Sequence, residues 1–384
     1  MKKNIMLSLD SWYPQIGGPN VVVSNYLKYL SENNEVTLAV PSYGKKTDAL
    51  VDGQTGIDVM HVFSVYLPVG GFRNCMPQFD GPLHERAKHA DIYHAHSPFA
   101  LGNYFAGAGK RYDRPTVLTF HTKFRDEFMR YTRSRALTAI MMSRIMGVMN
   151  RTQHVWTVSN GAAGTLREYG YKGDIKVIRN GTDMTVPADP DALVARVNAE
   201  YGLADEENVL LFVGRVVEVK NLALAFGALR LLKGRMKFRF VIVGDGEGMK
   251  DYRAMAEEYG LADSVLFTGT ITDREYLKAF YLRADLFVFP SVFDTASLCP
   301  IEAAAFGLPA LLVEGSPTAE IVKDGFSGYT APAEPHAWAE RIHAALSDRA
   351  AHERVRGNCR RHVYRSWKDV VAEVEAEYDR LLTT

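Results

Sequence analysis

The stretch VLLFVGRVVEVKN, residues 209–221, decides the fold class of this chain. Its five consecutive apolar residues, Val209–Val213, have the length and composition of a buried strand that a glycine ends. Arg215 and Lys220 follow, five positions apart, before the next helical pattern. Both cations would project from the carboxyl end of the strand, where a diphosphate could be held. The alternative is a surface ion pair between Arg215 and Glu218.

The same alternation of strand and helix patterns extends outward from this stretch over almost the whole chain. In the first half, strands are predicted at Asn4–Leu9, Glu35–Val40, Ile57–Val62, Ile92–Ala95, Pro115–Phe120, His154–Val158 and Lys176–Ile178. In the second half, they are predicted at Val209–Val213, Arg239–Val243, Val265–Thr268, Leu286–Phe289 and Ala310–Val313. This alternation predicts parallel βαβ units. Each half therefore supports its own doubly wound α/β sheet.

A hinge is predicted between the two halves. Residues 180–191 are rich in turn-forming residues, contain two prolines and have no regular period. Asp189-Pro190-Asp191 has the spacing of an acidic metal-binding motif, but it follows no strand, so we interpret it as linker. Because ligands bind outside the carboxyl ends of parallel strands, two such sheets predict a deep cleft between the domains.

The end of the chain predicts an amphipathic helix over residues 367–378. Its apolar stripe consists of Val370, Val371, Val374, Tyr378 and Leu381. We expect a first domain over residues 1–182, a second over 183–365, and this helix within 366–384.

The composition is that of a folded globular protein. The 384 residues are 47% hydrophobic and 23% charged, which excludes disordered, collagen-like and coiled-coil chains. The three cysteines have no CxxC spacing, so we expect reduced thiols and no thiolate zinc site. The apolar run Ile5–Leu9 is too short for a signal peptide, and no run approaches the roughly 20 residues of a membrane span. We therefore expect a cytoplasmic location.

Zero net charge conceals an asymmetry along the chain. Residues 1–183 hold 22 basic and 15 acidic residues, whereas the remainder holds 23 basic and 30 acidic residues. A basic half predicts an anionic partner. The alternative is that the two halves attract each other.

Two glycine-rich loops follow predicted strands. Gly17-Gly18 precedes a helix, so that backbone N–H groups could approach a phosphate closely, although a plain turn fits as well. The loop lacks the GxGxxG pattern, which disfavours a nicotinamide-dependent enzyme. Gly244, Gly246 and Gly248 alternate after another strand, and they predict close approach of either a ligand or neighbouring backbone.

The densest signal lies in residues 287–309. Asp294 and Glu302 bracket a turn between a strand and a helix, and Pro300 suits the first helical turn. Glu302 could accept hydrogen bonds from ligand hydroxyls, while backbone N–H groups of the turn face an anion. The alternatives are a helix cap for Glu302 and an ordinary loop position for Asp294. Residues 314–320 predict another capped helix beside the same crevice.

Three histidines follow strands of the first half. His94 and His96 share one face of a strand end, and His121 ends the strand before the basic segment. Two histidines without a third converging ligand make a poor zinc site, so we predict no metal. Its predicted position in the cleft of the first domain favours His121 as a site residue.

Residues 122–151 predict a basic helix with an aromatic and methionine face. Such a helix is typical of contact with an anionic membrane surface or an anionic lipid, although packing into the core would explain its apolar face equally well. The predicted membrane or acceptor residues are Lys123, Phe124, Arg125, Phe128, Arg130, Tyr131, Arg133 and Arg135.

Taken together, these motifs resemble family 4 retaining glycosyltransferases, which have the GT-B fold of two Rossmann-like domains facing a cleft. The resemblance covers nearly the whole chain and includes the terminal helix, which in that fold crosses back onto the first domain. It implies that Arg215 and Lys220 hold the diphosphate of a nucleotide-sugar donor. It further implies that Glu302 binds the ribose and that Asp294 contacts the transferred hexose.

Other positions follow from the same resemblance. His121 would face the sugar near the acceptor, and Gly17 and Gly18 would lie against the phosphate. The remaining donor-site residues are Gly246, Ser297, Leu298 and Cys299. The family usually has Glu at the position of Asp294 and Phe-Gly at Ala296-Ser297, so the sugar pocket is altered here. The segment His121-Thr122-Lys123-Phe124, with Tyr131, looks like that of bacterial diacylglycerol glucosyltransferases.

The predicted reaction is transfer of a hexose, glucose from UDP-glucose, to a membrane lipid or membrane-proximal acceptor. His121, Asp294, Arg215 and Lys220 would serve catalysis, and the cations and helix N-termini would stabilise the leaving diphosphate without a metal or other cofactor. The protein would attach peripherally to the inner face of the membrane and bind no nucleic acid. The alternatives are a soluble or polysaccharide acceptor and a non-catalytic module that binds nucleotide sugars.

Overall fold

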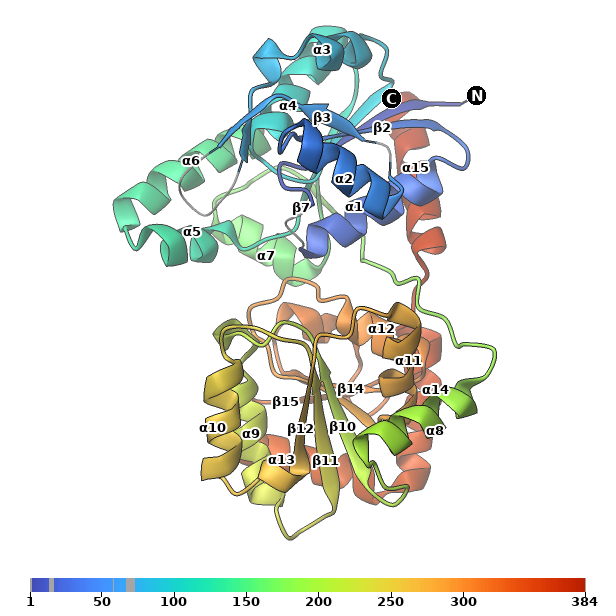
Figure 1. The fold of residues 1–384 in the computed structure, drawn as a ribbon. Helices are drawn as coiled ribbons and strands as arrows, with labels where there is room; N and C mark the ends of the chain where they lie inside the picture. Colours follow the sequence, from blue (N-terminus) through green and yellow to red (C-terminus); the bar gives the residue numbers. More distant parts are fainter. Residues whose placement is uncertain (1, 14–16, 58, 67–72, 384) are drawn as a thin grey trace. The chain divides into compact units, whose positions relative to one another are not determined.

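The computed structural model describes residues 2–13, 17–57, 59–66 and 73–383. The chain forms two compact units, each shown in Figure 1. The first unit comprises Met1–Asn180 and Trp367–Thr384, and the second comprises Gly181–Ser366. The terminal segment adds five acidic and two basic residues to the first unit, so the charge difference between the units is smaller than between the sequence halves.

The first unit is built on a seven-stranded sheet in the order β3-β2-β1-β6-β7-β8-β9, whose neighbouring strands are all parallel. Its strands are β1 (Asn4–Ser8), β2 (Glu35–Pro41), β3 (Met60–Val62), β6 (Ile92–Ala95), β7 (Thr116–Phe120), β8 (His154–Thr157) and β9 (Ile175–Val177). Its helices are α1 (Gly18–Leu30), α2 (Lys45–Thr55), α3 (Gly81–Lys88), α4 (Ala100–Tyr112), α5 (Phe124–Thr132), α6 (Arg135–Arg151), α7 (Asn160–Glu168) and α15 (Trp367–Thr383).

The second unit is built on a six-stranded parallel sheet in the order β12-β11-β10-β13-β14-β15. Its strands are β10 (Asn208–Val213), β11 (Phe238–Val243), β12 (Val265–Gly269), β13 (Leu286–Phe289), β14 (Ala310–Val313) and β15 (Tyr329–Ala331). Its α-helices are α8 (Pro190–Tyr201), α9 (Leu222–Leu232), α10 (Met249–Glu258), α11 (Arg274–Arg283), α12 (Cys299–Ala305), α13 (Pro335–Ser347) and α14 (Arg349–His362). Helices α9 and α10 cover one side of this sheet, and α8 and α11 cover the other (Figure 1).

These two sheets confirm the predicted α/β class, with one doubly wound sheet in each half. The sequence analysis missed β15 and the antiparallel hairpin of β4 (Ser64–Tyr66) and β5 (Arg73–Cys75), because three-residue strands give little periodic signal. The strand predicted over residues 57–62 includes residue 58, which lies outside the described residues, and β3 covers its last three positions.

Helix α15 completes the first unit through the predicted apolar stripe. Trp367, Val370, Val371, Val374, Tyr378 and Leu381 are all buried. Tyr378 stacks on Trp156, and its hydroxyl lies 2.6 Å from Nδ1 of His94 on β6. An ion pair of 2.7 Å between Lys176 on β9 and Glu377 on α15 also joins the helix to the sheet. The helix is therefore part of the first unit's core.

Two segments differ from their predicted structures. Asp189 accepts a hydrogen bond from the N–H of Ala192 and caps α8, which begins at Pro190, so interpreting residues 189–191 as linker was wrong. The helix predicted near residues 314–320 is a 3-10 helix, η4 (Pro317–Ile321), and the side chain of Ser316 makes no capping hydrogen bond to it.

The basic segment also differs from its prediction, since it forms two helices. Arg133 adopts a left-handed conformation with φ of 48°, which ends α5. The hydroxyl of Ser134 then accepts a hydrogen bond from the N–H of Leu137 and caps α6. A serine two positions after the last turn of α5 is the signal that the periodicity alone concealed.

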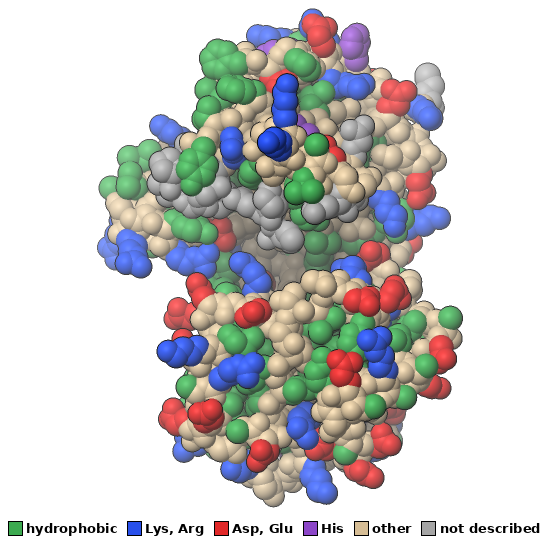
Figure 2. All heavy atoms as spheres, viewed as in Figure 1, with side chains coloured by type: hydrophobic (Ala, Val, Ile, Leu, Met, Phe, Trp, Pro, Cys, Tyr) green, Lys and Arg blue, Asp and Glu red, His purple; other side chains and the backbone are tan. Residues whose placement is uncertain are grey.

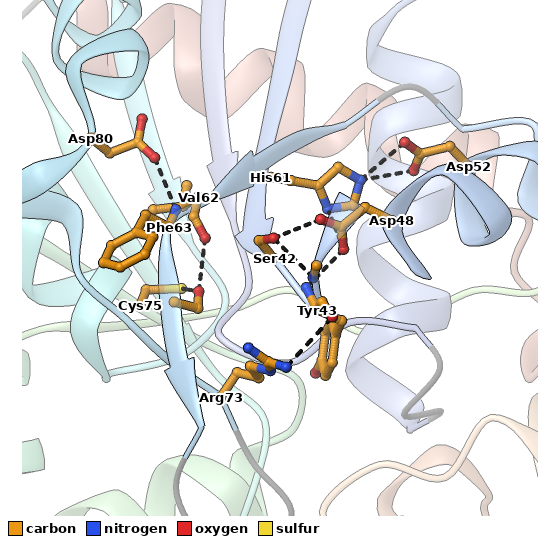
Figure 3. Close-up of polar contacts among 12 residues, drawn as sticks. Ser42, Tyr43, Asp48, Asp52, His61, Val62, Phe63, Arg73, Cys75 and Asp80 are labelled. Carbon is orange, nitrogen blue, oxygen red and sulfur yellow. Dashed lines mark hydrogen bonds and ion pairs between the residues drawn. The ribbon is translucent and has the colours of Figure 1, made fainter. Parts of the chain in front are cut away.

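A polar cluster fixes the edge of the first sheet (Figure 3). Nε2 of His61 on β3 lies 3.0 Å from both carboxylate oxygens of Asp52 on α2, and its Nδ1 lies 3.6 Å from Asp48. Asp48 accepts further hydrogen bonds from the hydroxyl of Ser42 and the N–H of Tyr43. These contacts tie α2 to the ends of β2 and β3.

None of the helices in the described ranges has the length and hydrophobicity needed to cross a bilayer.

Candidate active site

The loops after β10 and β13 meet at an ion pair in the second unit. Nζ of Lys220 donates to Oδ1 of Asp294 at 2.7 Å, and the two side chains are 13% and 21% exposed. Lys220 lies in the short 3-10 helix η2 (Glu218–Lys220). The side chains of Asn221 and Ser291 each donate to a carbonyl of the opposite loop, at 3.3 and 3.2 Å. The structure thus brings two predicted catalytic residues into direct contact.

The carboxylate of Asp294 is only half satisfied. Its second oxygen, Oδ2, is buried and has no hydrogen-bond partner among the described residues. A buried carboxylate oxygen without a donor is costly, so it is suited to accept a hydrogen bond from a ligand hydroxyl. Nζ of Lys220 also lies over the ring of Phe289, 5.2 Å from its centre, and this cation–π contact stabilises the ammonium group.

Arg215 is not part of the ion pair between Lys220 and Asp294. Its side chain is exposed, and the ion pairs of the described residues do not include the contact with Glu218 that was the alternative interpretation. A guanidinium at the carboxyl end of β10 that has no carboxylate partner in the described part of the chain can bind an anion.

Glu302, in the first turn of α12, is buried among protein groups. The hydroxyl of Tyr281 donates to its Oε2 at 2.9 Å, and Nη2 of Arg274 lies 3.8 Å from its Oε1. Arg274 also forms an ion pair of 2.7 Å with Asp183. The carboxylate therefore bonds to a side chain of α11, whereas the capping alternative would require the helix's own N–H groups.

Burial controls the ionisation of this region. It raises the pKa of Glu302, against the opposing effects of Arg274 and the hydrogen bond from Tyr281. Burial, with the nearby charge of Glu302, also raises the pKa of Cys299 to about 12. The Cys299 thiol is therefore protonated at neutral pH. It is a free cysteine, as the sequence predicted, and Ser297 and Leu298 lead into the helix that it begins.

The glycines after β11 are explained by the protein's own backbone. A Cβ atom on Gly244 would overlap the carbonyl oxygen of Gly214, and one on Gly246 would overlap that of Val216. The two segments are also hydrogen-bonded, with the N–H of Val216 donating to Asp245 at 2.9 Å. Of the two interpretations left open, close approach of backbone accounts for these residues. A donor contact at Gly246 stays a prediction.

The glycines after β1 lack such an explanation. Gly17 is the N-cap of α1 in an extended conformation with φ of −151°, and Gly18 begins the helix. Among the described residues, a Cβ atom on Gly18 would have no neighbour within 4 Å, and one on Gly17 would meet only ordinary contacts with Pro19 and Asn20. Residues 14–16 of this loop lie outside the described residues. The described surroundings therefore leave space at Gly18 for an approaching group.

Three histidines form a stack at the carboxyl ends of β6 and β7. The rings of His94 and His96 lie 4.2 Å apart, and those of His96 and His121 lie 5.3 Å apart. Nδ1 of His96 is 3.0 Å from Nε2 of His121. Burial lowers the pKa of His121 to about 4 and those of the other two well below their usual value, so all three are neutral at neutral pH. The sequence placed His94 and His96 together but did not predict the contact of His96 with His121.

The described residues contain no group of three or more His, Cys, Asp or Glu side chains arranged to hold a metal ion.

At the base of the Gly17 loop, Asp10 is buried and accepts hydrogen bonds from the N–H of Leu101 at 2.9 Å and the hydroxyl of Ser97 at 2.7 Å. Burial raises its pKa to about 6. Asp10 thus anchors this loop to the start of α4.

Helices α5 and α6 divide the predicted membrane or acceptor residues into two groups. Phe124 and Phe128 are buried and stack on each other, so the alternative of core packing, and not membrane contact, accounts for these two residues. Tyr131, Leu137 and Ile140 are exposed by 47%, 53% and 54%. Figure 2 shows basic and hydrophobic side chains side by side over these helices.

We call the exposed group the α5–α6 surface. It consists of Arg130, Tyr131, Arg133, Arg135, Leu137, Ile140 and Arg144. Of the remaining predicted residues, Lys123 is the N-cap of α5, and the guanidinium of Arg125 lies 4.5 Å from the ring centre of Tyr169. Core packing and an exposed apolar face therefore both occur in this segment, on different sides of the helices.

Three residues of the second unit escaped the sequence analysis. Tyr281, Arg274 and Asp183 surround the carboxylate of Glu302 directly or through one contact. Arg274 and Tyr281 are seven positions apart, a spacing that places two side chains on one helix face. That spacing could have linked them to each other, but nothing local links them to Glu302.

Comparison with known proteins adds to this geometry. The family described as Glycosyltransferase Family 4 matches residues 16–186, and that described as Glycosyl transferases group 1 matches residues 195–362. The alpha-monoglucosyldiacylglycerol synthase of Streptococcus pneumoniae is 25% identical over 323 residues, which are 82% of this chain and 71% of that relative. A D-inositol 3-phosphate glycosyltransferase of Xylanimonas cellulosilytica is 27% identical over 377 residues, with coverage of 90% and 87%.

Solved structures agree on the fold. Anabaena Alr3699/HepE, in a complex with UDP and glucose, superposes with a TM-score of 0.76 at 18% identity, covering 98% of this chain and 99% of that one. The glycosyltransferase WaaG superposes with a TM-score of 0.68 at 15% identity, over 98% and 99% of the two chains. The two family matches fall on the two sheets, one on each. The chain belongs to the family 4 glycosyltransferases and is a hexosyltransferase of class EC 2.4 with the GT-B fold.

Proposed function

We propose that this glycosyltransferase moves glucose from UDP-glucose to a lipid acceptor at an anionic membrane surface. The observation that carries the donor assignment is the pair of Lys220 and Asp294, with the unpartnered Oδ2 of Asp294 beside it. A cation next to a buried carboxylate oxygen that needs a donor offers both groups that a sugar phosphate requires. One neutralises the phosphate, and the other accepts a hydrogen bond from a sugar hydroxyl.

The reaction that these groups support begins with cleavage of the bond between the anomeric carbon and the diphosphate. Negative charge then grows on the leaving nucleoside diphosphate, and Arg215 and Lys220 stabilise it without a divalent ion. The acceptor hydroxyl attacks the same face of the sugar, and its proton passes to the departing phosphate oxygen. Glu302 binds the ribose, and the open backbone at Gly17 and Gly18 lies against the phosphate.

His121 serves the acceptor side in this proposal. Its pKa of about 4 keeps the imidazole neutral, so it can hydrogen-bond to a hydroxyl without adding charge near the sugar. The contact with Nδ1 of His96 holds the ring in one orientation. His121 is thus suited to position the acceptor.

Glucose and UDP are proposed from the relatives. One similar structure contains UDP-glucose, and one relative is named as a monoglucosyldiacylglycerol synthase. Another relative, 25% identical, is named as a GDP-mannose-dependent mannosyltransferase, so the donor has to be tested directly. Asp294 is one methylene shorter than the glutamate usual in the family, and it would alter the distance to the sugar.

The lipid acceptor is proposed from the α5–α6 surface. Its four arginines lie beside exposed Tyr131, Leu137 and Ile140, and this combination fits an interface of anionic headgroups and acyl chains. We also propose a peripheral position on the inner face of the cell membrane, which the positive charge of the same surface supports.

A soluble acceptor is the second candidate. The D-inositol 3-phosphate glycosyltransferase relative covers 90% of this chain, more than the glycolipid synthase does. In that case the α5–α6 surface would have no part in acceptor binding, and turnover would be indifferent to anionic vesicles.

A donor and acceptor panel tests the proposal. The purified protein is incubated with UDP-, GDP- and ADP-sugars, with and without anionic vesicles that contain diacylglycerol, and products are identified by mass spectrometry. We expect a glucolipid only in the mixture that contains both UDP-glucose and the vesicles. Transfer to an inositol phosphate instead would establish the soluble candidate, and a product from GDP- or ADP-sugars would overturn the donor assignment.

A further inference from the structure

A basic depression lies on the second unit, at the end of α12 opposite to Glu302. It has a volume of about 360 Å³ and is lined by Phe306, Gly307, Arg356, Gly357, Arg360 and Arg361. Three of the six lining residues are arginines on α14, although the second unit as a whole has more acidic than basic residues. The depression therefore concentrates positive charge on an otherwise acidic unit.

Two glycines keep the depression open. Gly307 ends α12 with φ of 67°, which favours glycine, and a Cβ atom there would come within 3.3 Å of the carbonyl oxygen of Arg356. A Cβ atom on Gly357 would lie 3.4 Å from Nη2 of Arg361. Side chains at these positions would crowd the arginines that line the depression.

The three guanidinium groups have few partners within the described chain. Arg356 donates to the carbonyl of Ala284 at 3.1 Å, and its Nε lies 3.9 Å from the mostly exposed carboxylate of Glu353. Arg361 donates to Asn358 at 3.1 Å. None of the described hydrogen bonds or ion pairs involves the side chain of Arg360. Among the described residues, the carboxylate of Glu353 is thus the acidic group paired with these three arginines, and most of their positive charge is available to an anion.

Stabilisation of the helix end is a simpler account of part of this cluster. Cations in the last turn interact favourably with the helix dipole, and Arg360 and Arg361 lie in the last turn of α14. Arg356 lies outside that turn, and a dipole effect requires no concave surface. The helix end therefore accounts for two of the three arginines and leaves the depression unexplained.

We propose that this depression binds a phosphate group, carried either by a soluble phosphate monoester or by a lipid headgroup. Planar guanidinium groups bind phosphate oxygens through paired N–H donors, and their positive charge favours a phosphate dianion. The volume is at the lower end of the range for ligand pockets, about 300–1,000 Å³, which suits a small head group.

Occupancy of the depression has a direct route to Glu302. The ring of Phe306 stacks on that of Tyr281, with centroids 5.6 Å apart and planes 6° apart. The hydroxyl of Tyr281 donates to Glu302 at 2.9 Å. A phosphate that shifts Phe306 therefore acts on the carboxylate to which we assign ribose binding. This link rests on the proposed function, whereas the phosphate site itself does not.

Direct binding measurements test the site. All proteins carry Lys220→Ala, so that the donor site contributes little to phosphate binding. They also carry Arg130→Gln and Arg135→Gln, so that the α5–α6 surface contributes little to vesicle binding. Affinity is measured by titration calorimetry. The soluble probes are inorganic phosphate and glycerol 3-phosphate, and the lipid probe is phosphatidylcholine vesicles containing phosphatidic acid. We expect Arg360→Gln to weaken binding about tenfold or more, since it removes a charge-assisted contact. Arg354→Gln removes the same charge from the same helix outside the depression and should leave the affinity unchanged.

The outcomes separate the sources of the phosphate. Saturable binding of the soluble probes, lost in Arg360→Gln, supports a free phosphate monoester. Binding of vesicles alone, with the same loss, supports a lipid headgroup. Equal effects of Arg354→Gln and Arg360→Gln, or no binding of any probe, would overturn the site.

Steady-state kinetics with otherwise unaltered protein test the link to Glu302. The probe that binds should change KM for the donor more than kcat, and Phe306→Leu should abolish this change while the probe still binds. An unchanged KM with the probe bound would remove the link and leave the phosphate site intact. Absence of any turnover would concern the proposed function and not the site.

Discussion

The two glycine loops, after β1 and after β11, have a similar composition but different surroundings. At Gly244 and Gly246 the neighbouring backbone occupies the space that a side chain would need. At Gly17 and Gly18 the described chain leaves that space open, although neither has a positive φ that would require glycine. The first pair is thus explained by folding, and the second is not.

This difference teaches how a glycine-rich loop can be assigned to structure or to ligand binding. A glycine that the folded chain itself requires carries no information about ligands. A glycine that the described chain does not require leaves room for a group from outside the chain. The comparison therefore assigns close packing of backbone to the loop after β11, and it leaves the loop after β1 open to the donor contact that we propose.

The largest expected effect comes from closing the packed loop. Gly244→Ala should lower the free energy of unfolding by about 3–5 kcal/mol, because it combines an unfavourable φ of 139° with overlap on the Gly214 carbonyl. Urea denaturation followed by circular dichroism measures the change. A loss below about 1 kcal/mol would show that the loop can relax, and the contrast between the loops would fail.

Closing the open loop should act on turnover and spare stability. Gly18→Ala should change the free energy of unfolding by no more than about 0.5 kcal/mol, because no atom of the described residues lies within 4 Å of the added methyl group. It should lower kcat/KM by about 100-fold, since the methyl group displaces the donor phosphate. Unchanged turnover in the folded variant would show that Gly17 and Gly18 form a plain turn with no contact to the donor.

The base of the open loop predicts a pH dependence. Burial raises the pKa of Asp10 from its ordinary value of 3.8 to about 6, so the folded state binds more protons than the unfolded state between these values. Stability should therefore fall as pH rises through this window, by about 2 kcal/mol from this group. Urea denaturation at pH 4 and pH 6.5 measures the fall.

Asp10→Asn provides the comparison for this pH effect. It removes the titrating group while keeping an oxygen that can accept from the N–H of Leu101. Its stability should vary less than that of the unaltered protein across the same window. An identical pH profile in both proteins would show that Asp10 does not titrate there.

The smallest effect concerns the carboxylate of the second unit. Tyr281→Phe removes the hydrogen bond to Glu302 and should cost about 1 kcal/mol of unfolding free energy. It should also raise KM for the donor with little change in kcat. Tyr276→Phe is the matched control, because that hydroxyl on the same helix donates to Glu200. Equal kinetic changes in the two variants would contradict a specific role for Tyr281.

The sequence predicted what depends on local patterns. Buried strands such as Val209–Val213 are continuous apolar runs, and the stripe of α15 repeats at helical spacing, so both could be predicted. Asp294 and Glu302 were predicted because they flank a recognisable turn. Breaks set by single residues, such as Arg133 between α5 and α6, were lost within a longer apolar pattern.

What the sequence could not give depends on contacts between distant residues. The bond from Tyr281 to Glu302, the stack of His96 on His121 and the carbonyls that face Gly244 and Gly246 all join separate elements. Phe124 and Phe128 show the same limit, since periodicity placed them on an apolar face but could not tell a core from an exposed surface.

The most direct test of the account is the turnover of Lys220→Ala. Lys220 carries the charge that we assign to the donor diphosphate, so its loss should lower kcat about 100- to 1,000-fold while the protein stays folded. Lys237→Ala, which removes an exposed lysine before β11, is the control and should retain full activity. Turnover of the folded Lys220→Ala variant equal to that of the unaltered protein would contradict the donor site described above.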